Sequence, residues 1–154
     1  MDCGFALEAD EELSYDTVAP RRNGATLAVL AAADVIIAVG AADPIGLQRL
    51  IRGLVELRDG EFEAPIWVVL NRVRAAVVPG KPEAELAAAL QRFAGRSPAA
   101  FLPYDRNALD SAMANGKTLA EARPKSQLRQ RMVELAAALA GVAAGTGSRR
   151  RRRA

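Results

Sequence analysis

Three short apolar runs, each ending in polar residues, dominate the pattern of this chain. The runs lie within Asp34–Gly40, Ile66–Arg72 and Ala99–Asp105. Continuous apolar runs of this length are typical of strands that are buried on both faces of a parallel sheet. Ligands of such sheets bind at the carboxyl ends of the strands, where Asn71, Arg72 and Asp105 fall. The pattern therefore predicts a ligand site at this end of the sheet.

Segments with helical periodicity separate the apolar runs. After the first run, Asp43 is placed to cap a helix that has Pro44 at its first position. Leucines and an isoleucine then recur at helical spacing, at Leu47, Leu50, Ile51, Leu54 and Leu57. Further helices are expected over about 23–33, from Pro82 to Gly95 with Leu86, Leu90 and Phe93 on one face, from Asp105 to Asn115, after Thr118, and from Ser126 with Leu128, Met132, Leu135 and Leu139. The alternation predicts an α/β fold: a parallel sheet with right-handed connections and helices on both faces.

Composition narrows the class of protein. The 154 residues are 51% apolar and 25% charged, as in an ordinary single globular domain. The apolar stretches are much shorter than the roughly 20 residues of a membrane-spanning helix, and residues 2–16 are acidic rather than signal-like. One cysteine, Cys3, and no histidine exclude an internal disulfide, cysteine-cluster metal sites and Ser-His or Cys-His catalysis. We therefore expect a cytoplasmic protein.

The net charge of +3 comes from one end of the chain. Arg149, Arg150, Arg151, Arg152 and Arg153 supply five of the 21 basic residues, and the remaining sixteen face 18 acidic ones, which leaves the rest at −2. Glycines precede this arginine run, as in a flexible spacer. We therefore expect a folded domain over 1–141 and a flexible basic tail over 142–154. The tail is either a weak binder of DNA or anionic membrane, or a solvated end without a partner.

The polar residues at the strand ends have two interpretations each. Asn71 can pair its amide with the edge of a purine base while Arg72 stacks on the base, or Asn71 can simply end a strand and cap a loop. Asp105 can border a nucleotide or only cap the following helix, and the sequence alone favours the cap. Asp2, a carboxylate near the start of the chain, can hold a water molecule bound to Mg²⁺.

Gly116-Lys117-Thr118 matches the end of a phosphate-binding loop but not the whole motif. The motif requires a glycine five residues before Gly116, where Ser111 stands, and it should follow a strand rather than a helix. Gly116 as a helix end, and Thr118 with Glu121 as a capping box, account for the segment fully. We therefore expect no phosphate loop there.

Taken together, these motifs resemble the C-terminal two-thirds of the ParA/MinD-type ATPases, the deviant Walker-A family, and most closely its MinD-like and CpaE-like members. Asp2-Cys3-Gly4 is similar to the Walker B aspartate and the start of switch II. The run from Ala33 to Val39 with Ala42-Asp43-Pro44, the run Val68–Arg72, and Leu102-Pro103-Tyr104-Asp105 followed by Ala112 and Gly116 are similar to later segments of the family, in the same order. The resemblance extends from Asp2 to about Gly141.

The resemblance implies a P-loop NTPase-like sheet and a nucleotide site. Asn71 would recognise the base of ATP, with Arg72, Pro103 and Asp105 lining the same pocket, and Asp2 would contact Mg²⁺ through water. It also implies a homodimer or a protein partner, and a role in spatial positioning: septum placement, chromosome partition or pilus assembly.

This chain departs from the family at the phosphate site. The phosphate loop with its lysine, the first switch and the strand before Asp2 are absent from these residues, and arginines replace the family's amphipathic membrane-targeting tail. We therefore expect a truncated domain, missing its N-terminal strands, that does not hydrolyse ATP in this form. The alternative is an interaction module of the same fold that binds no nucleotide, and a third candidate is a nucleic-acid-associated protein acting through its arginines. Peripheral contact with membrane or nucleoid would then depend on the tail.

Overall fold

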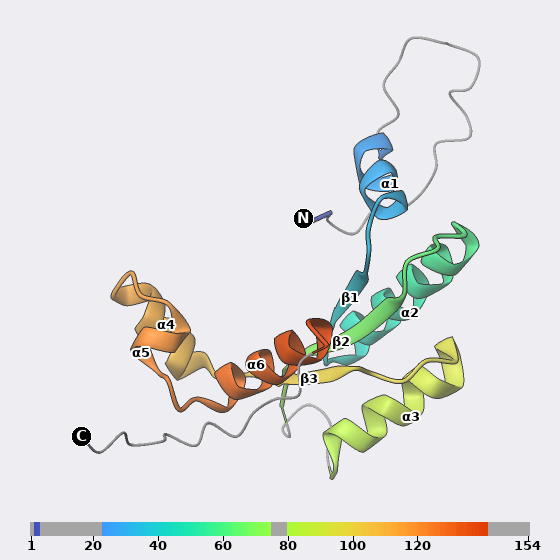
Figure 1. Cartoon of the computed structure of the whole chain (residues 1–154). Coiled ribbons are helices and arrows are strands. Elements are labelled where there is room, and N and C mark those ends of the chain that lie inside the picture. Colours follow the sequence, from blue (N-terminus) through green and yellow to red (C-terminus); the bar gives the residue numbers. More distant parts are fainter. Residues whose placement is uncertain (1, 4–22, 75–79, 142–154) are drawn as a thin grey trace. The chain divides into compact units, whose positions relative to one another are not determined.

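The computed structural model describes residues 2–3, 23–74 and 80–141, in which strands and helices alternate (Figure 1). The described elements are α1 (Gly24–Ala31), β1 (Ile36–Ala41), α2 (Pro44–Asp59), β2 (Ile66–Val73), α3 (Pro82–Ala94), β3 (Ala100–Pro103), α4 (Arg106–Ala114), α5 (Leu119–Ala122) and α6 (Gln127–Leu139). Two compact units divide the chain, Met1–Phe101 and Leu102–Ala154, and each is treated by itself.

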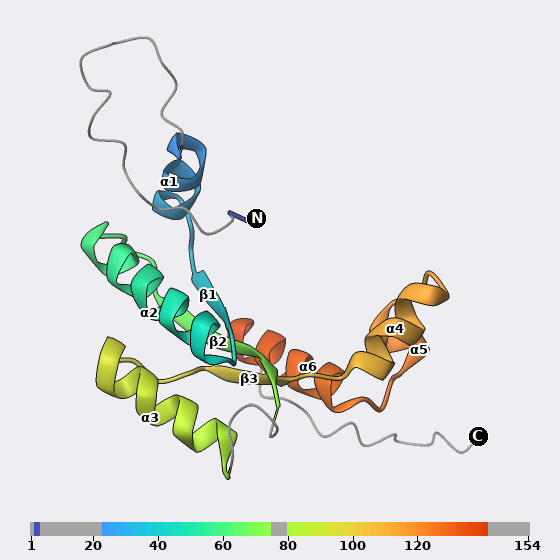
Figure 2. The same ribbon diagram turned by 180° about the vertical axis from the view of Figure 1, so that it is seen from behind.

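The strands form one sheet in the order β1-β2-β3. β1 and β2 are parallel, with Ile36 paired to Ile66 and Ala41 to Asn71 at the two ends of the register. The backbone N–H of Ala99 donates to the Val68 carbonyl at 2.7 Å, immediately before β3 begins. The two ribbon views both show β1 and β2 side by side (Figures 1 and 2). The predicted α/β class with a partial parallel sheet is confirmed.

α2 begins where the sequence predicts and packs closely on β1. The Asp43 carboxylate accepts a hydrogen bond from the Gly46 N–H at 2.8 Å, and Pro44 occupies the first turn. Two glycines permit the close approach: a Cβ at Gly46 would lie 2.5 Å from the Ala41 carbonyl oxygen, and one at Gly40 would lie 2.7 Å from the Leu50 side chain. The absence of side chains at these two positions therefore determines how near the helix lies to the strand.

The hydrophobic core of the first unit lies between β1, β2 and the helices that follow them. Leu50, Leu54 and Leu57 are the buried residues of α2, as the helical spacing predicts. The cluster also includes Leu30, Ile36, Ala42, Val68, Leu70, Leu86 and Leu90. Each fully buried leucine or valine contributes about 1.5–3 kcal/mol relative to an exposed one. This packing holds the strands that carry the predicted site residues.

α3 confirms one part of its prediction and contradicts another. Gly95 ends the helix in the left-handed region, at φ 62°, and Leu86 and Leu90 are buried. Phe93, expected on the same apolar face, is instead 61% exposed, and its ring lies 5.2 Å from the Arg92 guanidinium carbon. Residue spacing sets the direction of a side chain around the helix axis, but Phe93 is in the last turn, beyond the buried part of α3.

The second unit is organised by side-chain caps. Asp105, Thr118 and Ser126 cap α4, α5 and α6, as predicted. Ala108, Ala112 and Leu128 are its buried helical residues, whereas Met113, Met132 and Val133 are exposed. The apolar face of α6 is thus buried only near the start of that helix.

Some predictions fall outside the described residues. They concern the arginines of the tail, Arg149–Arg153, most of the acidic segment near the start, and most of the loop before α3. None of the helices in the described part of the chain is both long and apolar enough to span a membrane.

Candidate functional site

Asn71 and Arg72 have an unusual backbone conformation near the end of β2. The Asn71 Oδ1 accepts a hydrogen bond from the Arg72 N–H at 2.8 Å, and Arg72 has φ 61°, in the left-handed region. A residue other than glycine held in this region costs about 1–3 kcal/mol, and such residues cluster at functional sites. The strand continues to Val73, so the prediction that Asn71-Arg72 closes it is wrong by one residue.

This conformation leaves part of the Asn71 amide for other partners. Among the described residues, the hydrogen bond of its side chain uses Oδ1 alone. An amide has two lone pairs on its oxygen and two N–H donors, so Nδ2 and one lone pair remain. Asn71 can therefore hold the Arg72 backbone near the end of β2 and still present a donor and an acceptor to a ligand. The two interpretations made from the sequence are compatible with each other.

A second group of polar residues surrounds a hollow after β3. The hollow has a volume of about 280 Å³ and is lined by Pro103, Tyr104, Asp105, Arg106, Asn107 and Gln127. The first five run from the last residue of β3 into the first turn of α4, and Gln127 is the first residue of α6. All six belong to the second unit. The hollow therefore lies at the carboxyl end of a strand, where ligands of α/β sheets bind.

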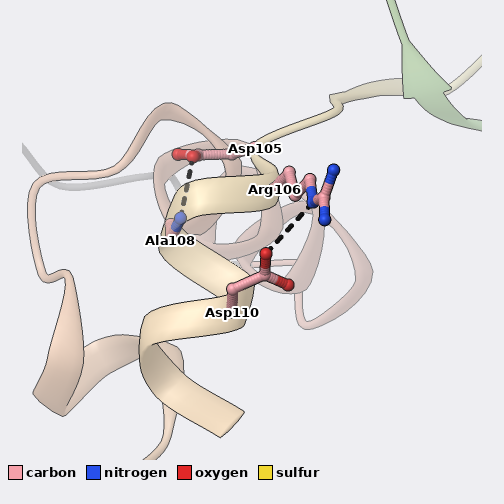
Figure 3. Close-up of polar contacts among 4 residues, drawn as sticks. All are labelled: Asp105, Arg106, Ala108 and Asp110. Carbon is pink, nitrogen blue, oxygen red and sulfur yellow. Dashed lines mark hydrogen bonds and ion pairs between the residues drawn. The ribbon is translucent and has the colours of Figure 1, made fainter. Parts of the chain in front are cut away.

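The two charged residues of this hollow already have intramolecular partners. The Asp105 Oδ1 accepts from the Ala108 N–H at 3.1 Å, which confirms the cap, and the Arg106 Nε donates to Asp110 Oδ2 at 3.1 Å. Figure 3 shows the two side chains engaged with different residues of α4. Two amides, a phenol and a proline ring supply the rest of the lining. This set suits a flat polar ring better than a phosphate, because the Asp105 carboxylate repels anions and the Arg106 guanidinium is already paired with Asp110.

The structure assigns the predicted nucleotide residues to two units. Pro103 and Asp105 line the hollow, whereas Asn71 and Arg72 belong to the first unit. A single pocket formed by all four stays a prediction. Sequence reasoning missed Tyr104, Arg106, Asn107 and Gln127. The first three adjoin Asp105 and could have been found from that proximity, but Gln127 comes from another helix and has no local signal.

The described residues do not fit a Mg²⁺ site that the protein forms by itself. Among them, no group of three or more histidines, cysteines or carboxylates is arranged to hold a metal. Asp2 is exposed, and the next residue, Cys3, accepts a hydrogen bond from the Thr26 hydroxyl at its carbonyl oxygen, at 3.3 Å. One carboxylate can only supplement a Mg²⁺ ion that arrives with phosphates. The Mg²⁺ contact of Asp2 stays a prediction.

Comparison with known proteins supports the fold. No protein-family model and no curated protein sequence matches the chain. Among solved structures it is similar to the crystal structure of a ParA family ATPase from Chlorobium tepidum TLS, with a TM-score of 0.56 and 23% sequence identity. The match covers 77% of this chain and 45% of that one, so the chain spans less than half of the ATPase. The likeness shows a ParA-like α/β fold.

Proposed function

We propose that this chain is the C-terminal part of a nucleotide-binding domain of the MinD/ParA/CpaE-like type, which takes part in spatial positioning in the cytoplasm. The observation that carries the proposal is the hollow at the end of β3, formed by residues that follow a strand of a ParA-like sheet. In this proposal, Asn71, Arg72, Pro103 and Asp105 contact the base of ATP, and in the intact domain Asp2 contacts, through water, a Mg²⁺ ion that arrives with the phosphates.

The chemistry of the lining supports a base-binding role without hydrolysis. Amide and phenol groups match the donors and acceptors of a purine ring. Phosphoryl transfer requires groups that position the phosphates and stabilise their charge, and residues 1–154 contain no complete phosphate loop. The chain alone therefore binds the base and leaves the phosphates in solvent.

Binding of adenosine, AMP and ATP to residues 1–154 tests this proposal. Saturation-transfer NMR and equilibrium titration should give similar affinities for the three ligands, with dissociation constants on the order of 1 mM, or roughly −4 kcal/mol. Affinity that rises more than about tenfold from adenosine to ATP would mean that these residues hold the phosphates. No binding of any of the three contradicts the proposal.

Asn71→Ala tests the contribution of the first unit. We expect it to weaken adenosine binding about threefold to tenfold, the worth of one hydrogen bond. Asn115→Ala is the matched control, because the Asn115 amide donates to the Ser111 carbonyl at 2.7 Å at the end of α4, and Asn115 does not line the hollow. Equal effects of the two substitutions would mean that Asn71 has no part in binding.

A specific observation favours the alternative, an interaction module without nucleotide. Ile37 and Val39 on β1 and Met113 on α4 are exposed apolar residues, at 42%, 58% and 78%. Such residues are suited to a protein partner, including a second copy in a homodimer. The ligand titration separates the alternatives, since the module should bind no adenosine while retaining its fold by circular dichroism.

The arginine tail is a second segment for which we propose a binding role. We propose that Arg149–Arg153 bind DNA or anionic membrane weakly, since each arginine can neutralise a phosphate. On duplex DNA the tail would add a salt slope of up to about −4.5, from roughly −0.9 per phosphate. Titration of the whole chain and of a chain ending at Gly147 across a salt series tests this. Unchanged affinity and slope after the deletion would leave the tail without a binding role.

A further inference from the structure

Gln127 contributes a primary amide to the hollow after β3, from a helix that the sequence did not connect with the site. It is the first residue of α6. Side chains of an α-helix tilt toward its N-terminus, so a side chain at the first position extends beyond the helix end. Tyr104, before α4, and Asn107, in its first turn, line the same hollow. Gln127 thus provides the part of the lining that is not adjacent to Asp105 in sequence.

The Gln127 amide is not required to cap its own helix. The Ser126 hydroxyl does this, accepting from the Arg129 N–H at 3.2 Å. The next glutamine, Gln130, directs its Nε2 to the Lys125 carbonyl at 3.5 Å. Among the hydrogen bonds that the structure describes within 102–141, none uses the Gln127 side chain. Its donor and acceptor are therefore available to a ligand in the hollow.

We propose that Gln127 is a specificity-determining residue that selects adenine over guanine in this hollow. This inference rests on the proposed nucleotide binding. Its Oε1 accepts from the exocyclic amino group of adenine, while its Nε2 donates to the neighbouring ring nitrogen, the bidentate pairing that amide side chains make with this base. Guanine presents two acceptors at the corresponding edge. It therefore leaves Oε1 without a donor.

A cycle of two proteins and two ligands tests this contact. The unchanged chain and Gln127→Met are each titrated with adenosine and with purine riboside, which lacks the exocyclic amino group. We expect Gln127→Met to weaken adenosine binding about threefold to tenfold, the size of one or two neutral hydrogen bonds. It should weaken purine riboside binding less, because that ligand keeps the ring nitrogen that accepts from Nε2 but lacks the amino group that donates to Oε1. Guanosine should bind the unchanged chain more weakly than adenosine, and Gln127→Met should narrow that difference.

Gln130→Met is the matched control, since it makes the same chemical change one turn along α6, outside the lining. It should leave all affinities unchanged, and circular dichroism checks that both variants remain folded. If the unchanged chain binds adenosine and Gln127→Met binds adenosine as tightly as the unchanged chain does, the assignment of Gln127 is wrong while the proposed function stands. If the unchanged chain binds none of these ligands, the proposed function and this inference are both wrong.

Discussion

Thr118 and Glu121 cap each other across the first turn of α5. The Thr118 N–H donates to Glu121 Oε2 at 2.9 Å, the Thr118 hydroxyl donates to the same oxygen at 2.7 Å, and the Glu121 N–H donates to Thr118 Oγ1 at 3.3 Å. Gly116, at φ 57°, follows the end of α4. The segment that matches the end of a phosphate loop is therefore a connection between two helices, whose threonine is engaged in a cap.

Residues 1–154 should release no phosphate from ATP above background. The reason is that Lys117 lies between two helices rather than in a loop that encloses a phosphate. A steady-state phosphate-release assay with Mg²⁺ measures this, and Lys117→Ala should give the same rate as the unchanged chain. Turnover that Lys117→Ala abolishes would show that this segment does serve as a phosphate loop.

The capping box predicts how Glu121 titrates. Hydrogen bonds from the Thr118 side chain and then from its backbone lower the pKa of Glu121 below 4.5. The folded state thus favours the carboxylate, so the cap contributes fully above pH 4.5 and is lost as the pH falls through the lowered folded pKa. A carbon-detected NMR titration of Glu121 should give a pKa below 4.5 that Thr118→Ala raises. An unchanged pKa in Thr118→Ala would mean that the cap does not form in solution.

Two glycines of α2 provide a matched pair for the packing of the first unit. Gly53→Ala should stabilise the chain by about 0.5–1 kcal/mol, because a Cβ there meets nothing within 4 Å and alanine is the better helix former. Gly46→Ala should destabilise it by about 1–3 kcal/mol, since its Cβ would press on the Ala41 backbone. Urea unfolding followed by circular dichroism measures both. Equal effects would contradict the close contact between α2 and β1.

The sequence predicted the elements well because their signals are local. Asp43, Thr118 and Ser126 cap the helices that they were expected to cap, and each cap depends on residues within one turn. The prediction that Phe93 lies on the buried face was wrong, because helical periodicity does not specify where along α3 the core ends. Arg72 could not be predicted either, because no residue preference indicates a positive φ at an arginine inside a strand.

The sequence predicted only those residues of the hollow that are close to one another along the chain. Pro103 and Asp105 follow an apolar run and do line a hollow. Gln127 reaches that hollow through the fold of the second unit, which brings together residues that are distant along the chain. No spacing rule relates the start of α6 to the end of β3. The predicted nucleotide contacts of Asn71 and Arg72 stay predictions, because these residues belong to the first unit and the lining of the hollow to the second.

The exposed residues of β1 should make the chain associate. β1 is at the edge of the described sheet, has no charge or proline, and exposes Ile37 and Val39. An uncharged apolar edge strand can pair with another chain. Sedimentation velocity over a concentration series should therefore show association that Val39→Lys reduces, with a change in unfolding free energy within about 0.5 kcal/mol. Val69→Lys is the contrast, because Val69 pairs with Val39 in the register but is only 1% exposed, so a lysine there should unfold the chain. A chain that stays monomeric at every concentration, or a Val39→Lys variant that associates as strongly as the unchanged chain, would mean that this edge is not the contact surface.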